Sequence, residues 1–114
     1  MSETPDARWA LVAEAMKSWA ESWGDQSYGA VLVLEGSVVG FGPSRVILNS
    51  NQDAHAEREA IRDAQQRLGR ERLNRSILYS TSRPCRLCEQ AAARAGVQRV
   101  FFGRHLQDAG APTL

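Results

Sequence analysis

The sequence predicts an α/β domain with three layers, in which helices pack on both faces of a mixed sheet of four to five strands. Apolar residues recur at steps of three and four in two stretches, which is typical of amphipathic helices. Short β-rich runs separate the helical stretches and give the order α-β-β-α-β-α-β. Strands that alternate with helices favour a sheet with parallel pairs, whose faces the helices cover.

The expected organisation is a single domain of residues 1–114. The chain is 43% hydrophobic and 24% charged, which suits one hydrophobic core. The net charge is +1, and no block of Lys and Arg marks a nucleic-acid stripe. No apolar run approaches the ~20 residues of a membrane span, and the acidic, polar N-terminus is not typical of a signal peptide. We therefore expect a cytoplasmic protein with no membrane partner.

The first half of the chain predicts one helix and one hairpin. The helix is expected from about Thr4 to Gly24. The run YGAVLVLEGSVVGFG predicts two strands on either side of a tight turn at Glu35 and Gly36. Residues 43–51 are expected to form a loop. The apolar stripe of the first helix consists of Trp9, Val12, Met16, Trp19, Ala20 and Trp23.

The second half predicts two more helices and two more strands. The second helix is expected to begin at Asp53, as its N-cap, and to end at Gly69. RSILYST predicts the third strand and QRVFFG the fourth, and a short fifth strand could lie in the last eleven residues. The third helix is expected from Pro84, in its first turn, to about Ala95, before Gly96. The buried face of the second helix would comprise Ala60, Ile61, Ala64 and Leu68.

Two chemically reactive motifs stand at the predicted starts of two helices. HAE, residues 55–57, begins the second helix, and PCRLC, residues 84–88, begins the third. In open α/β sheets, functional sites gather at the edge where the strands end and the helices begin. The two motifs can therefore converge, although 29 residues separate His55 from Cys85.

The ligand types favour a zinc site with one open position. Cys85 and Cys88 are three residues apart, so on a helix both sulfur atoms can face one point. With the imidazole of His55 they would supply three ligands, the arrangement of a catalytic zinc site. A structural site needs a fourth ligand, but there is no third cysteine, and His105 is far down the chain. A redox dithiol is the alternative, but a thioredoxin-like pair would follow the first strand.

Glu57 is the candidate catalytic residue. It lies two positions after His55 and does not share its helical face, but from the first turn it can reach over the metal without binding it. A carboxylate in that place can take a proton from zinc-bound water and return it to a leaving group. Bound zinc lowers the pKa of water to roughly 7. The predicted chemistry is hydrolytic attack on an electron-poor carbon.

HAE followed by PCRLC resembles the H-x-E…P-C-x-x-C signature of the zinc-dependent cytidine deaminase superfamily. The resemblance is nearly continuous from Gln26 to Gly103, and the hairpin and the strand-helix-strand block look like those of nucleobase deaminases and tRNA adenosine deaminases. It implies a cytidine deaminase-like fold with zinc between two helices beneath a five-stranded sheet. The roles that it implies are zinc ligation by His55, Cys85 and Cys88 and proton transfer by Glu57.

The resemblance also implies contacts with the substrate. Backbone groups near Ala56 and Cys85, and Pro84 at the start of the second motif, are expected to contact the base. Tyr28 falls at a position that often lines the pocket wall, where its ring can stack on the base. Ser44 stands where many guanine and adenosine deaminases have an asparagine that binds the substrate, and is the fifth candidate substrate contact.

Two further departures from the family pattern flank the motifs. Residues 51–54 read NQDA where relatives have Asp-Pro-Thr-Ala, and Arg83 stands where a glutamate often precedes Pro-Cys. Arg83 and Arg86 can attract a phosphate or simply be solvated. The metal chemistry is compatible with all of these differences. The choice of substrate is expected to depend on them.

The predicted function is zinc-dependent hydrolytic deamination of a nucleobase, nucleoside or related amino-heterocycle, with release of ammonia. The alternative is conversion of adenosine to inosine in tRNA. Against it stand the modest net charge and the eleven residues after Gly103, which leave little room for the C-terminal helix of many such relatives. A catalytically silent zinc scaffold is a third reading, but such a protein has no use for Glu57. The expected partners are a small-molecule substrate and further copies of the chain, in a homodimer or larger oligomer.

Overall fold

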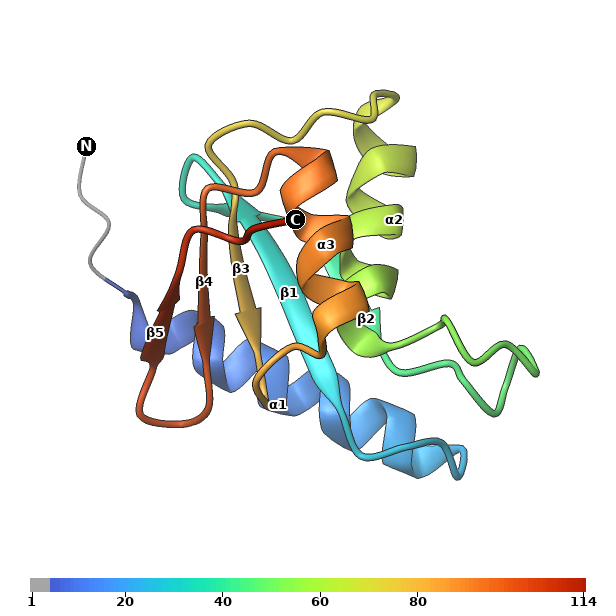
Figure 1. The fold of residues 1–114 in the computed structure, drawn as a ribbon. Helices are drawn as coiled ribbons and strands as arrows, with labels where there is room; N and C mark the ends of the chain where they lie inside the picture. Colours follow the sequence, from blue (N-terminus) through green and yellow to red (C-terminus); the bar gives the residue numbers. More distant parts are fainter. Residues whose placement is uncertain (1–4) are drawn as a thin grey trace.

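The computed structural model describes residues 5–114 and shows a five-stranded mixed sheet between two layers of helices (Figure 1). The predicted fold class is confirmed, including the short fifth strand. Thr4, the predicted start of the first helix, lies outside the described residues. Among residues 5–114, no helix combines the length and apolar character that a membrane crossing requires. The elements are α1 (Ala7–Ser22), β1 (Gly29–Leu34), β2 (Ser37–Pro43), α2 (Ala56–Leu68), β3 (Ile77–Ser80), α3 (Arg86–Ala95), β4 (Arg99–Phe102) and β5 (Gln107–Gly110).

The strands are arranged in the order β2-β1-β3-β4-β5. β1 pairs antiparallel with both β2 and β3, β3 pairs parallel with β4, and β4 pairs antiparallel with β5. The single parallel pair is the one that α3 connects, as expected for a strand-helix-strand unit. The predicted turn between β1 and β2 is confirmed, and Glu35 and Gly36 have φ of 52° and 78°, as a tight hairpin turn requires.

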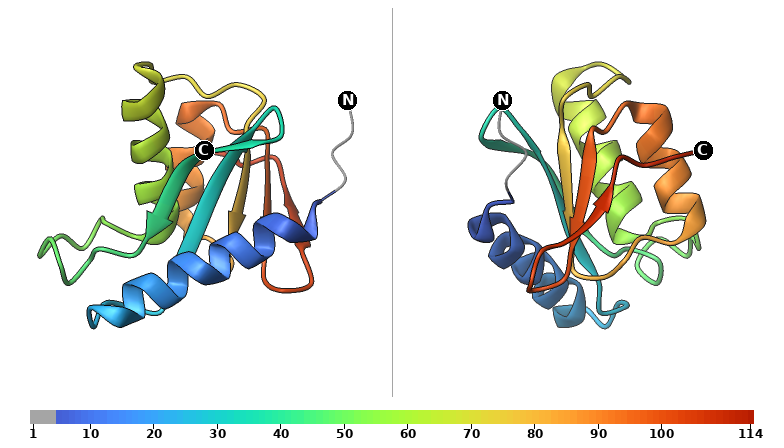
Figure 2. Two further views of the ribbon diagram at one scale, coloured as in Figure 1. Left: turned by 180° about the vertical axis from the view of Figure 1, so that it is seen from behind. Right: turned by 60° about the vertical axis from the view of Figure 1, so that its left-hand side comes forward.

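Helices cover both faces of the sheet (Figure 2). Each face has its own apolar cluster. α1 covers one face, where Val12 and Met16 pack against buried side chains of β1, β3 and β4. α2 and α3 cover the other face, where Ala60 and Ala92 are fully buried. Trp19 differs from the prediction, because it is 48% exposed and packs edge-on against Trp23 rather than into the core. The apolar stripe of α1 is therefore longer than the surface of the sheet that it covers.

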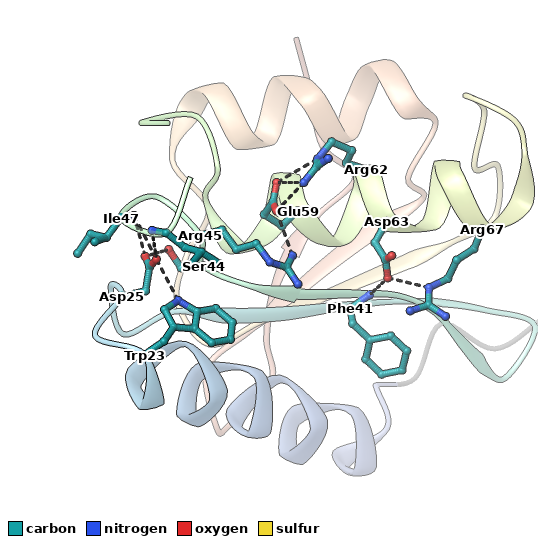
Figure 3. A network of polar contacts seen from close by, with 11 residues as sticks. Trp23, Asp25, Phe41, Ser44, Arg45, Ile47, Glu59, Arg62, Asp63 and Arg67 are labelled. Atoms are coloured by element: carbon teal, nitrogen blue, oxygen red, sulfur yellow. Dashed lines mark hydrogen bonds and ion pairs between the residues drawn. The ribbon is translucent and has the colours of Figure 1, made fainter. Parts of the chain in front are cut away.

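Small residues bring α2 close to the sheet. A Cβ atom at Gly42 of β2 would overlap the carbonyl oxygen of Ala56, in the first turn of α2. β2 is an edge strand, and the carboxylate of Asp63 on α2 accepts a hydrogen bond of 2.9 Å from the backbone N–H of Phe41 (Figure 3). Arg67 pairs with Asp63 at 2.8 Å and lies over the Phe41 ring. This close packing fixes the first turn of α2 against β2.

Both motif helices begin later than predicted. α2 begins at Ala56 with His55 as its N-cap, whereas the predicted cap, Asp53, is exposed and forms an ion pair of 3.5 Å with Arg58. α3 begins at Arg86 with Cys85 as its N-cap, because the backbone N–H of Cys88 donates to the Cys85 sulfur at 3.5 Å.

Two single residues of these helices also differ from the prediction. Pro84 precedes α3 instead of lying in its first turn, because α3 begins at Arg86. Leu68 is 37% exposed because it is the last residue of α2, where the helix extends past the core. The rest of the predicted face of α2, Ala60, Ile61 and Ala64, is buried as expected.

Candidate metal centre and active site

Three candidate ligands converge between the starts of α2 and α3. The Nδ1 atom of His55 lies 3.4 Å from the sulfur of Cys88 and 3.7 Å from that of Cys85. All three ligand atoms lie within 4.8 Å of one another. A tetrahedral zinc ion, with Zn–N of about 2.0–2.1 Å and Zn–S of about 2.3 Å, places a nitrogen and a sulfur ligand about 3.6 Å apart. The three side chains therefore fit one zinc ion.

The surroundings of Cys88 favour the neutral thiol over the thiolate. Burial raises the pKa of the Cys88 thiol, and the nearby charge of Glu57 raises it further. A thiol in such surroundings stays protonated unless a cation compensates the thiolate charge. Because Cys85 and His55 are the N-caps of two helices, the partial positive charge of both helix starts adds to this compensation.

Glu57 lies beside the ligand set and is itself almost completely buried, with 5% of its surface exposed. Its Oε2 atom accepts a hydrogen bond of 2.8 Å from the hydroxyl of Ser80, at the end of β3. Ser80 is 3% exposed, and its oxygen also accepts a weak hydrogen bond of 3.4 Å from the backbone of Ser82. The carboxylate is therefore held in one orientation within the protein.

Ser80 is a site residue that our sequence reasoning missed. The signal was a polar residue at an inward position of a strand, because Ser80 lies two residues after the fully buried Leu78. A serine at such a position needs a hydrogen-bond partner in the core, and a carboxylate in the facing helix supplies one.

An open cavity of about 790 Å³ lies over the ligand set. Its volume falls within the range of about 300–1,000 Å³ that is common for ligand sites. Tyr28 forms part of the wall, and 46% of its surface is exposed. The lining consists of Gln26, Ser27, Tyr28, His55, Ala56, Glu57, Ser82, Arg83 and Cys85.

Three of the five predicted substrate contacts line this cavity, namely Ala56, Cys85 and Tyr28. Ser44 does not. It is fully buried, and its hydroxyl lies 3.1 Å from the Asp25 carboxylate, so it has no surface from which to contact a substrate. Pro84 faces a separate crevice, beside Glu89 and the C-terminal residues.

Asp25 is a second residue that sequence reasoning missed, and it organises the protein next to the cavity wall (Figure 3). Burial by itself would raise the pKa of this carboxyl, but the hydrogen bonds that it accepts outweigh burial and lower the pKa to about 2. These bonds join the end of α1, the start of the cavity wall and the loop after β2. The donors are the indole of Trp23, the hydroxyl of Ser44 and the backbone N–H groups of Gln26, Ile47 and Leu48.

Comparison with solved structures gives the same architecture. The chain superposes with a TM-score of 0.83 on a structure from a study of A-to-I editing by tRNA A34 deaminases, at 34% identity, over 86% of this chain and 71% of that one. It also resembles the crystal structure of guanine deaminase from Bacillus subtilis, with a TM-score of 0.82 and 30% identity, over 88% of this chain and 64% of that one.

Curated sequences point in the same direction. The chain is 32% identical to the tRNA-specific adenosine deaminase of Buchnera aphidicola (subsp. Schizaphis graminum), over 95% of this chain and 72% of that protein. It is 40% identical to the corresponding protein of Agrobacterium fabrum and 37% identical to the guanine deaminase of Bacillus subtilis, over 73% and 72% of this chain. It spans only 55% and 53% of the length of these two proteins.

A family model matches most of the chain. Residues 3–104 match the cytidine and deoxycytidylate deaminase zinc-binding region. The matched residues include the whole ligand set and the strands and helices that position it. The chain belongs to this zinc-binding deaminase family.

Proposed function

We propose that the protein hydrolytically deaminates an amino-substituted nucleobase, either free or as part of a nucleoside or nucleotide, and releases ammonia. One observation carries the proposal. Glu57, a buried carboxylate that is not part of the ligand set, lines the same cavity as two of the three zinc ligands. A purely structural zinc site has no need of a fixed carboxylate at its open side, whereas a hydrolytic site does.

A zinc ion bound by His55, Cys85 and Cys88 would supply a Lewis acid that makes water a nucleophile near neutral pH. The chain supplies the movement of protons. Because Ser80 occupies Oε2 of Glu57, the other oxygen is free to take a proton from the attacking water and pass it to the substrate. As water adds to the carbon that bears the amine, the C–N bond breaks, the carbon becomes a carbonyl, and the amine leaves as ammonia.

Deamination of adenosine in tRNA is the second candidate. Several relatives are tRNA-specific adenosine deaminases, which favours this candidate. The cavity is open and Tyr28 is exposed at its wall, which suits a base presented from outside on a larger molecule.

We further propose that the protein forms a homodimer or larger oligomer. We also propose that it works in a reducing compartment such as the cytoplasm, because both cysteines must stay out of disulfide bonds to bind zinc.

The proposal is tested with zinc-loaded protein and a substrate panel. Ammonia release is measured with free bases, nucleosides and nucleoside monophosphates, and inosine formation is measured in a tRNA whose wobble base is adenosine. We expect turnover of at least one of these substrates. Turnover of the small molecules alone favours the first candidate, and turnover of tRNA alone favours the second. Zinc-loaded, folded protein that converts none of them contradicts the proposal.

A further inference from the structure

We propose that Arg83 forms a phosphate subsite at the cavity, so that the preferred substrate is a nucleobase that carries a phosphate through its sugar. This inference deepens the proposed function and rests on it. The phosphate can be that of a nucleotide or of a nucleic-acid backbone, which share the same chemistry.

The first observation is the position of Arg83. It lies on the connection from β3 to α3, two residues before the ligand Cys85. Arg83 lines the cavity together with His55 and Glu57, and it also borders the small crevice beside Pro84. Gln26, Ser27 and Tyr28, which also line the cavity, are uncharged. Arg83 is therefore the permanent cation among the lining residues.

The second observation is how Arg83 is held. Its guanidinium lies 5.4 Å from the ring centroid of Phe102, at the end of β4, a distance typical of a cation–π contact. Within residues 5–114, no carboxylate pairs with Arg83, although it is exposed. By contrast, Arg45 and Arg62 are both engaged by Glu59. The Arg83 guanidinium thus lies near an aromatic ring, and among residues 5–114 no carboxylate neutralises its charge.

The third step is the orientation that the chemistry imposes. The carbon that bears the amine must face Glu57 and the ligand set, so the sugar of a nucleoside extends away from them within a cavity large enough for more than a base. The anion that a nucleoside commonly carries on its sugar is phosphate. A planar guanidinium donates two parallel hydrogen bonds to phosphate oxygens, which makes arginine better suited to this role than a point charge.

The test measures binding rather than turnover. The Glu57→Gln variant, loaded with zinc, keeps the cavity and Arg83 but does not consume its ligands. Calorimetry compares adenosine, guanosine and cytidine with their 5′-monophosphates, and then with short single-stranded RNA at several salt concentrations. Arg83→Gln is added to this background, and Arg86→Gln serves as the matched control, because Arg86 is exposed nearby but does not line the cavity.

We expect at least one monophosphate to bind on the order of tenfold more tightly than its nucleoside, and we expect Arg83→Gln but not Arg86→Gln to abolish that difference. If only RNA shows an effect specific to Arg83, with a shallower salt dependence, the phosphate comes from a nucleic acid. If neither ligand class responds to Arg83, or both arginine variants act alike, the proposal is overturned. Arg83-dependent binding without ammonia release by the wild-type protein would instead contradict the proposed deamination.

Discussion

The hydroxyl of Ser80 donates a hydrogen bond of 2.8 Å to Oε2 of Glu57, and both side chains are buried. This contact joins the end of β3 to the first turn of α2. It engages one carboxylate oxygen and leaves the other for proton transfer. It therefore defines the orientation from which Glu57 acts in the proposed reaction.

Ser80→Ala should lower kcat by on the order of tenfold and leave KM and zinc content nearly unchanged, because the carboxylate loses its fixed orientation. Steady-state kinetics and metal analysis check this. Ser76→Ala is the matched control, because Ser76 is a buried serine just before the same strand whose hydroxyl bonds to the backbone of Leu73. Ser80→Thr, which keeps a hydroxyl, should recover part of the activity. Equal losses in the Ser76 and Ser80 variants would show a structural effect only.

Zinc should bind with one ion per chain, and Cys88→Ala should abolish this binding. In the proposed zinc site the thiolate of Cys88 is a ligand, and alanine at this buried position offers no group to replace it. Metal analysis after dialysis gives the stoichiometry, and thermal unfolding should show a lower Tm for the variant and for chelator-treated protein. Leu87→Ala, at an exposed neighbouring position, should keep both zinc and Tm. Full zinc content in Cys88→Ala would refute the assigned ligand set.

Asp25→Asn should lower the free energy of unfolding near neutral pH. It should also reduce the amount by which that free energy falls in acid. The pKa of Asp25 in the folded protein is about 2, below its usual value of 3.8, so the charged form stabilises the fold above about pH 4. That contribution, on the order of 2 kcal/mol, is lost as the pH falls from about 4 to about 2. Urea unfolding at pH 7, 4 and 2.5 measures it. Asp53→Asn, at an exposed position of the loop between β2 and α2, is the control, and an identical pH dependence in both variants would contradict the assignment.

Gly42→Ala should destabilise the protein by about 1–3 kcal/mol, because the added Cβ would overlap the carbonyl oxygen of Ala56 and push α2 from the sheet. The displacement acts on the turn that carries His55, so zinc affinity should fall as well. Denaturant unfolding and a competition titration for zinc measure the two effects. Ser37→Ala, at an exposed position of the same strand, should change neither. Unchanged stability in Gly42→Ala would show that the helix can move away at no cost.

The sequence was sufficient to predict the architecture and the convergence of the two motifs, because hydrophobic periodicity and the spacing of His and Cys residues are local signals. The exact helix starts were not predictable. The N-cap positions are occupied by two of the candidate ligands, His55 and Cys85, and histidine and cysteine are not common N-caps. Ser44 was expected at the substrate, but it is buried against Asp25. Contacts such as this one, and that between Ser80 and Glu57, depend on how distant segments pack, which no local pattern encodes.

The most direct test of the account is the rate of ammonia release by zinc-loaded wild-type protein and by zinc-loaded Glu57→Gln, measured on the best substrate of the panel. Glutamine keeps the shape of the side chain and can still accept the hydrogen bond from Ser80, but it cannot take up a proton in the reaction. We expect the variant to bind zinc normally and to release ammonia at least a hundredfold more slowly, as is typical when a general acid–base group is lost. A variant that binds zinc and retains the wild-type rate would contradict the proposed role of Glu57 and the mechanism built on it.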